Sequence, residues 1–241
     1  MKYYSVRSSL SRKVTGHYPQ VKGIKYSCDV WDEPRFIEHV YFTPVLDFEP
    51  ITANAVLYAK SKSTDLINVT GMGFTKKPLV STKLKDILQQ FRKTGMQFFK
   101  SPVIKNGIVN EDYWVLNFFE VNMNFIDYTK SKVYLTENTF DLVRPLDIFD
   151  YNAYINTKEV IDEQGSPAGI LVDSINILPG VDKDFFVLTE VEGGVKYVAS
   201  EKLKAFIEQQ NCSGIEFMPL ELSFNEWVEK GGVRETVYGK V

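Results

Sequence analysis

The chain carries one sequence pattern twice. Residues 65–98 align without a gap with residues 184–217, at a constant offset of 119 positions, and ten of the 34 aligned pairs are identical. Average residue usage would give about two identities over this length. The repetition therefore indicates a duplicated supersecondary unit. Two copies fall short of a solenoid, which needs three or more repeats to bury a continuous core.

Each copy begins with the signals of two strands joined by a turn. The runs at residues 65–70 and 184–189 are short and rich in β-branched and aromatic residues, which is typical of strands. In the first copy Gly71 and Gly73 provide the turn, and in the second copy residues 193–194 are both glycine. Glycine tolerates the positive φ angles that hairpin turns require.

A helix and an exit strand complete each copy. Ser81 and Ser200 stand where a helix N-cap is needed, because a serine hydroxyl can accept an otherwise unpaired backbone N–H. An apolar face follows at helical spacing. Gly95 and Gly214 come just after the helix, where a left-handed residue ends it. The fold class expected is α+β, with two strand–turn–strand–helix–strand units built into mixed or antiparallel sheets with few helices.

One further helix is predicted near the end of the chain. Ser223 and Glu226 have the spacing of a capping box, in which each side chain bonds the backbone N–H of the other. The glycine pair at residues 231–232 should end this short helix.

Charge is unevenly distributed along the sequence. Residues 137–192 contain twelve acidic and three basic residues, and the first 136 residues have a net charge of +7. We therefore expect two lobes sharing one integrated body. Residues 1–136 would form a basic lobe with the first repeat, and residues 137–241 an acidic lobe with the second. Such asymmetry suggests a charged partner, although a solvated acidic face has the same composition.

The sequence favours a cytoplasmic protein that does not enter a membrane. Its first residues contain no apolar h-region of a secretory signal, and no apolar run is long enough to span a bilayer. Cys28 and Cys212 are too few for a disulfide framework, so we expect two thiols in a reducing compartment.

Motifs for catalysis, metals and cofactors are not found. His17 and His39 have no nucleophile motif beside them, and Cys28 with His39 would provide only two of the four ligands of a structural zinc site. No phosphate-binding glycine motif occurs. We expect no cofactor, no metal and no catalytic residue. A hydrolase using paired carboxylates, such as Asp147 and Asp150, stays open as an alternative. Nucleic-acid binding is disfavoured because the basic residues are dispersed.

Several segments in order resemble a large family of bacterial immunity proteins from polymorphic toxin systems. They are "GHYPQV", "PLVSTKLKDIL", "NFFEVNMNFIDYTKS" and "CSGIEFMPLE", and the resemblance covers most of residues 15–222. It implies a protein encoded beside a toxin, which it binds and blocks without chemistry of its own. No functional residue is carried over from the family. A non-toxin interaction module is the other alternative.

An inhibitor of this kind needs a rigid scaffold, aromatic anchors and complementary charge. A basic toxin is the partner expected, and the acidic stretch ahead of the second repeat is where we place its binding surface. A homo-oligomer is left open. The predicted partner-binding residues are Asp147, Asp150, Tyr151, Tyr154, Glu159, Asp162, Glu163 and Asp173.

Overall fold

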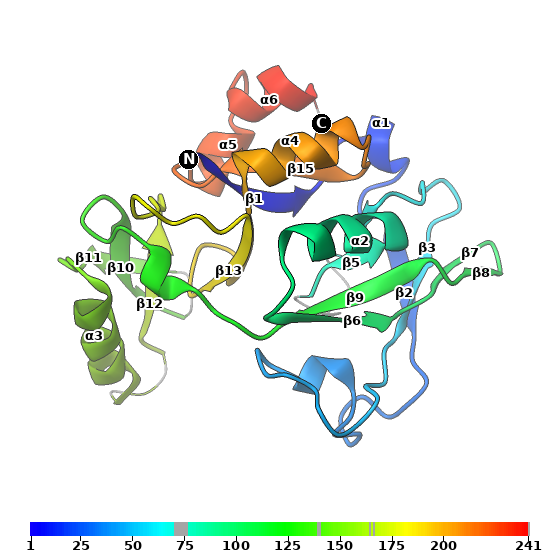
Figure 1. The fold of residues 1–241 in the computed structure, drawn as a ribbon, viewed down its shortest axis with the longest axis horizontal. Helices are drawn as coiled ribbons and strands as arrows, with labels where there is room; N and C mark the ends of the chain where they lie inside the picture. The colour runs from blue at the N-terminus through cyan, green and yellow to red at the C-terminus, as the bar shows by residue number, and fades with distance from the viewer. Residues whose placement is uncertain (70–76, 139–140, 164, 166, 241) are drawn as a thin grey trace. The chain divides into compact units, whose positions relative to one another are not determined.

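The computed structural model of the chain describes residues 1–69, 77–138, 141–163, 165 and 167–240. Within these ranges it contains six α-helices and 15 strands in four mostly antiparallel sheets, 23% helix and 33% strand. Strands outweigh helices, so the predicted α+β class with few helices is confirmed (Figure 1). The turn predicted at Gly71 and Gly73 lies outside the described residues.

The chain divides into two compact units, each assembled from separated segments. Unit 1 comprises residues 1–6, 121–202 and 217–237, and unit 2 comprises residues 7–120, 203–216 and 238–241. This division differs from the lobes expected at 1–136 and 137–241. The reason is non-local pairing: the N-terminal strand pairs with a strand of the second repeat, which the charge distribution does not reveal.

Unit 2 holds two four-stranded sheets. One has the order β4-β5-β9-β6 and the other β2-β3-β7-β8. The strands are β2 (Val21–Lys25), β3 (Asn54–Leu57), β4 (Leu66–Ile67), β5 (Leu79–Ser81), β6 (Met96–Lys100), β7 (Val103–Lys105), β8 (Ile108–Asn110) and β9 (Tyr113–Phe118). The helices are α1 (Arg12–Thr15), the 3₁₀ helix η1 (Ile37–His39) and α2 (Thr82–Phe91). A core with fully buried Ile37, Ala55, Leu79 and Val115 joins these elements.

Unit 1 contains the sheets β13-β14-β1-β15 and β11-β10-β12. Their strands are β1 (Tyr3–Ser8), β10 (Lys132–Glu137), β11 (Asp141–Pro145), β12 (Gly169–Asp173), β13 (Phe185–Thr189), β14 (Val195–Ser200) and β15 (Ile215–Pro219). The helices η2 (Met123–Phe125), α3 (Tyr151–Glu163) and α5 (Phe224–Val228) lie wholly in unit 1, whereas α4 (Glu201–Gln209) and α6 (Val233–Tyr238) contain residues of both units. The chain passes between the units within β1, α4, β15 and α6, and between Glu120 and Val121. The core of unit 1 includes Val172, Phe186, Leu188 and Val198.

The two copies of the repeat fold alike. In the first copy β4 and β5 pair antiparallel with Leu66 opposite Val80. In the second, β13 and β14 pair with Phe185 opposite Ala199, the same register moved by 119 positions. A helix and an exit strand follow in both, as α2 with β6 and α4 with β15. The two paired strands, the helix and the exit strand of the predicted unit are therefore present in both copies.

A strand from outside the repeat completes each sheet. β9 lies between β5 and β6, with Tyr113 opposite Ser81. In the other sheet β1 occupies the same place between β14 and β15, with Tyr3 opposite Ser200. One copy takes this strand from later in the chain and the other from the N-terminus.

The glycines expected to end the two helices have the left-handed conformation but do not end them, because α2 ends at Phe91 with Arg92 as its C-cap and α4 ends at Gln209. Gly95 has a φ of +80°, in the left-handed region where a side chain is strained. Gly214, at the corresponding position, has a φ of +81°, and a Cβ there would collide with the carbonyl of Leu66. The capping box at Ser223 and Glu226 is also confirmed, and α5 ends at Val228, shortly before the predicted glycine stop.

Candidate partner-binding surface

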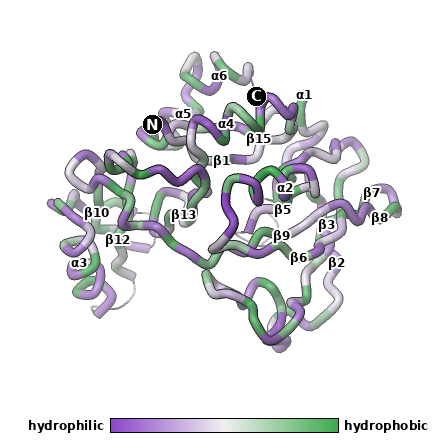
Figure 2. The backbone as a smooth tube through the Cα atoms, viewed as in Figure 1, coloured by the Kyte–Doolittle hydropathy of each residue, from purple (hydrophilic) through white to green (hydrophobic). Residues whose placement is uncertain are grey.

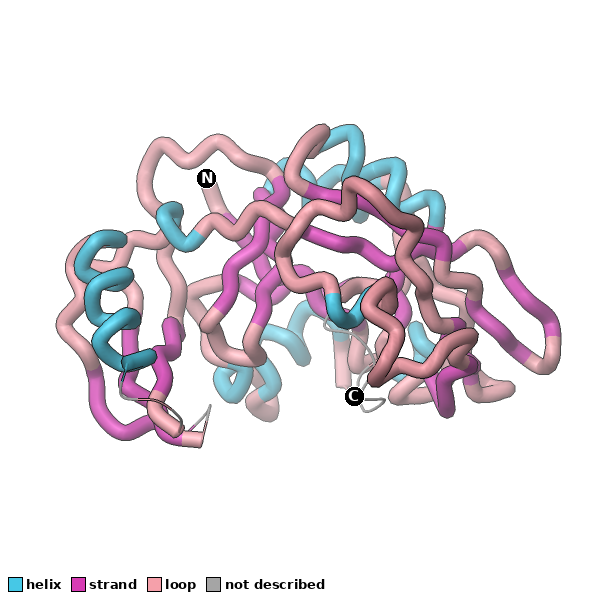
Figure 3. The backbone as a smooth tube through the Cα atoms, turned by 90° about the horizontal axis from the view of Figure 1, so that it is seen from below, coloured by secondary structure: helices cyan, strands magenta, loops and turns pink. Residues whose placement is uncertain are grey.

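The longest helix of unit 1, α3, lies within the predicted binding region and packs against β12 (Figure 3). Asp150 begins it, because its Oδ1 accepts the backbone N–H of Ala153 over 2.7 Å. This bond satisfies one of the four N–H groups that a helix leaves unpaired at its start. Asp150 thus has a structural task in addition to its exposed charge.

Tyr154 anchors α3 to its unit. Only 1% of the residue is exposed, and its ring stacks on Tyr128 with centroids 5.1 Å apart. The hydroxyl donates a hydrogen bond to the carboxylate of Glu190. Burial, together with the nearby negative charge of Glu190, raises the pKa of Tyr154, so the phenol stays a donor at neutral pH. Buried in this way, Tyr154 positions the helix and does not offer a surface to a partner.

Lys158 is the one base between residues 147 and 173. Its Nζ lies 2.6 Å from Asp162 Oδ2 and 3.0 Å from Glu190 Oε1. Burial alone would lower the pKa of Lys158, but hydrogen bonds to Asp162 and Glu190 outweigh it and raise that pKa. The ammonium is directed to these two carboxylates.

The remaining predicted residues on and beside α3 are exposed. We call them the α3 surface: Asp147, Asp150, Tyr151, Glu159, Asp162 and Glu163. Two exposed apolar residues accompany them, Phe149 at 69% and Val160 at 56%. Sequence reasoning missed both. The signal for Phe149 was its position between Asp147 and Asp150, where an apolar side chain has acidic neighbours on either side.

Asp173 lies apart from the α3 surface. It ends β12 opposite Lys132 of β10, and its Oδ1 is buried with no hydrogen-bond partner among the described residues. The carboxylate is half-buried rather than displayed. Of the eight predicted residues, six therefore form the surface, while Tyr154 and Asp173 face inward.

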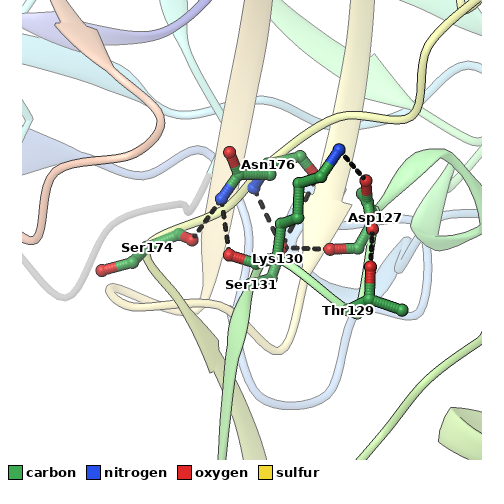
Figure 4. A network of polar contacts seen from close by, with 6 residues as sticks. All are labelled: Asp127, Thr129, Lys130, Ser131, Ser174 and Asn176. Carbon is green, nitrogen blue, oxygen red and sulfur yellow. Dashed lines mark hydrogen bonds and ion pairs between the residues drawn. The ribbon is translucent and has the colours of Figure 1, made fainter.

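A network of polar contacts fixes the end of β12 (Figure 4). Asp127 accepts a hydrogen bond from the Thr129 hydroxyl over 2.6 Å and lies 3.1 Å from Lys130 Nζ. Asn176 donates its side-chain N–H to the carbonyl of Lys130 over 2.7 Å, and its backbone N–H to Ser131 Oγ over 2.9 Å. The hydrogen bond from Thr129, with the others it receives, lowers the pKa of Asp127. The network links the turn before β10 to the segment after β12.

The two histidines and Cys212 have defined surroundings in the structure. His17 stacks on Tyr58 at 3.9 Å, and Nδ1 of His39 lies 3.0 Å from the carbonyl of Glu33. Burial raises the pKa of the Cys212 thiol to about 11, so it is protonated at neutral pH. Across the described residues, no three His, Cys, Asp or Glu side chains cluster as metal ligands.

A pocket of about 290 Å³ opens at the end of α2. It is lined by Gln89, Arg92, Lys93 and Met96. Arg92 there pairs with Glu120 and stacks over Phe118. This lining supplies cations rather than the paired carboxylates that the hydrolase alternative requires.

Comparison with models of protein families and with curated proteins gives no match to this chain. Along its described part, no helix is both long and apolar enough to cross a bilayer.

Proposed function

We propose that this protein is an immunity protein, which binds a cognate bacterial toxin in the cytoplasm and neutralises it by forming a stoichiometric complex. The α3 surface carries the proposal. Asp147, Asp150, Glu159, Asp162 and Glu163 are all exposed on or beside one helix. The nearby cation, Lys158, is engaged by Asp162 and Glu190, which leaves the outward field negative.

A helix with this charge suits a basic partner. Complementary charge accelerates encounter and discourages wrong partners, and it needs no catalytic group. Rigidity matters equally, because side chains that are already held in place lose less entropy on binding. Tyr154 provides that rigidity through its stacking on Tyr128 and its bond to Glu190.

Co-expression tests the proposal. The product of the adjacent gene is expressed alone, with this protein, or with a matched vector, and cell survival is counted. We expect toxicity alone, rescue by this protein, and a one-to-one complex on gel filtration. If the two proteins do not form a complex and co-expression of this protein does not restore survival, the proposal is wrong.

A further inference from the structure

Residues 26–53 connect β2 to β3 in unit 2, and we call this segment the aromatic loop (Figure 1). Its regular structure is the short helix η1, at residues 37–39. Loops of this length inside a compact domain are uncommon, and they are usually either functional or disordered. The contacts of the aromatic loop distinguish between these two cases.

The aromatic loop is held firmly in place. Phe36, Ile37, Val40 and Val45 are buried in the core of unit 2. Gln97 of β6 bonds both backbone groups of Val45, since its Oε1 accepts the N–H and its Nε2 donates to the carbonyl, each over 2.8 Å. The result is an irregular segment with a defined shape.

Two other polar side chains also donate hydrogen bonds to the backbone of the loop. Lys77 Nζ donates to the carbonyl of Val40 over 2.7 Å, and Asn117 Nδ2 donates to the carbonyl of Thr43 over 3.0 Å. Backbone carbonyls in the middle of the loop are thereby paired with the body of the unit. Little ordering of this backbone remains to be done on binding.

Several large apolar side chains of the loop lie outside the core and are exposed to solvent. Val30, Val40 and Val45 pack inward, and the next residue after each is exposed: Trp31 at 86%, Tyr41 at 64% and Leu46 at 78%. Hydrophobic and hydrophilic stretches alternate along the loop (Figure 2). Each valine already anchors the backbone, so folding does not require its apolar neighbour. Aromatic residues such as Trp31 and Tyr41 are enriched at the cores of protein–protein interfaces.

Exposed acidic side chains accompany these apolar residues. Four carboxylates of the loop are exposed, those of Asp29, Asp32, Asp47 and Glu49, and the one arginine of the loop is Arg35. Arg35 is paired with Glu33 at 3.0 Å. The Asp29 carboxylate accepts the backbone N–H of Trp31 over 2.9 Å, which orients the chain where the tryptophan protrudes.

We propose that the aromatic loop is the contact surface for the toxin, with Trp31 inserted into an apolar pocket that lysine and arginine side chains surround. This inference rests on the proposed function. It adds a contact in unit 2 to the α3 surface, at residues that the sequence analysis did not name. Tryptophan is the residue type most enriched among those that dominate binding energy. Carboxylates around it pair with the basic rim, which selects a basic partner over a neutral one.

The test uses the full-length chain and the purified product of the adjacent gene. Trp31→Ala should raise the Kd at least about tenfold, mainly through faster dissociation. Leu46→Ala is a second variant with the same direction. Ile108→Ala is the matched control, because Ile108 is 73% exposed on the β7–β8 hairpin of the same unit. Its Kd should stay within about twofold of the unmodified protein.

The outcomes separate the inference from the proposed function. If a complex forms and both Trp31→Ala and Leu46→Ala bind as tightly as Ile108→Ala, the inference is wrong and the proposed function stands. If no complex forms, both the inference and the proposed function are wrong. Self-association that Trp31→Ala abolishes, with toxin binding intact, would instead assign the loop to a second copy of this chain and overturn the inference.

Discussion

Ser81 donates a hydrogen bond to Oδ1 of Asp65 over 2.7 Å, and at the same offset of 119 Ser200 donates one to Oδ1 of Asp184 over 2.6 Å. The backbone matches as well: the N–H groups of the two serines bond the carbonyls of the two aspartates, over 2.8 and 2.9 Å. Each aspartate thus ties the start of its hairpin to the start of its helix. These are shared folding contacts, which explains why both residues are identical in the two copies.

Replacing either serine should therefore destabilise the protein by a similar amount. Ser81→Ala and Ser200→Ala each remove a buried donor to an aspartate, and Ser81 also caps Leu84 N–H over 3.2 Å. Each change should lower the free energy of unfolding by about 1–2 kcal/mol. Urea denaturation measures this, with the exposed Ser27→Ala as control. A loss in only one of the two variants would show that the copies do not share this contact.

Tyr113 and Tyr3 form a second matched pair. The Tyr113 hydroxyl donates to the carbonyl of Thr64 over 2.9 Å, and the Tyr3 hydroxyl donates to that of Val181 over 2.7 Å. Thr64 directly precedes Asp65, and Val181 lies three residues before Asp184. Burial, followed by the charge of Asp65, raises the pKa of Tyr113 above 10.0, and burial with Asp184 does the same for Tyr3.

These shifts predict a loss of stability in alkali. A phenol whose pKa is raised by folding stabilises the native state below pH 10, and this contribution is lost as the pH rises beyond 10 and the unfolded chain ionises. Tyr113→Phe should cost about 1 kcal/mol at pH 7, because a carbonyl loses its donor. Its stability should then fall less steeply above pH 10 than that of the unmodified protein. Parallel curves for the two proteins would contradict the prediction.

The sequence predicted local features such as helix caps better than it predicted which strands pair with one another. Ser81 and the capping box at Ser223 each act within a few residues, and both have the expected conformations. The insertion of β1 and β9 into the two sheets was not foreseen. Such pairing joins residues that are distant in the chain, such as Tyr113 with Ser81 and Tyr3 with Ser200, and neither propensity nor periodicity encodes it.

The candidate surfaces show the same contrast. Composition identified the carboxylates of the α3 surface, since charge can be counted directly. It did not reveal that Tyr154 is buried; its spacing of seven from Ile161, also buried on α3, was the available signal. Trp31 follows no regular period, because the aromatic loop alternates inward and outward residues without helix or strand geometry. Only the structure shows that Val30 packs against the core while Trp31 is exposed.

Asp127 predicts how stability changes in acid. Its pKa is lowered below 3.8 in the folded protein, first by the hydrogen bond from Thr129. It therefore stabilises the fold above pH 3.8, and this contribution is lost as the pH falls through the folded pKa. Asp127→Asn should lose about 1 kcal/mol at pH 7. The difference from the unmodified protein should shrink below pH 4 in urea titrations, whereas a constant difference would assign the loss to packing alone.

Charge reversal on α3 should slow association with the toxin. Glu159→Lys with Glu163→Lys is the variant of choice, because Asp162 is needed to pair with Lys158 at 2.6 Å. Removing the negative field should reduce kon about three- to tenfold at low salt and flatten its salt dependence. The control is Glu221→Lys with Glu229→Lys, which makes the same change in net charge at two other exposed positions. Stopped-flow kinetics compare them: if the two variants slow association equally, overall charge and not the α3 surface steers the encounter.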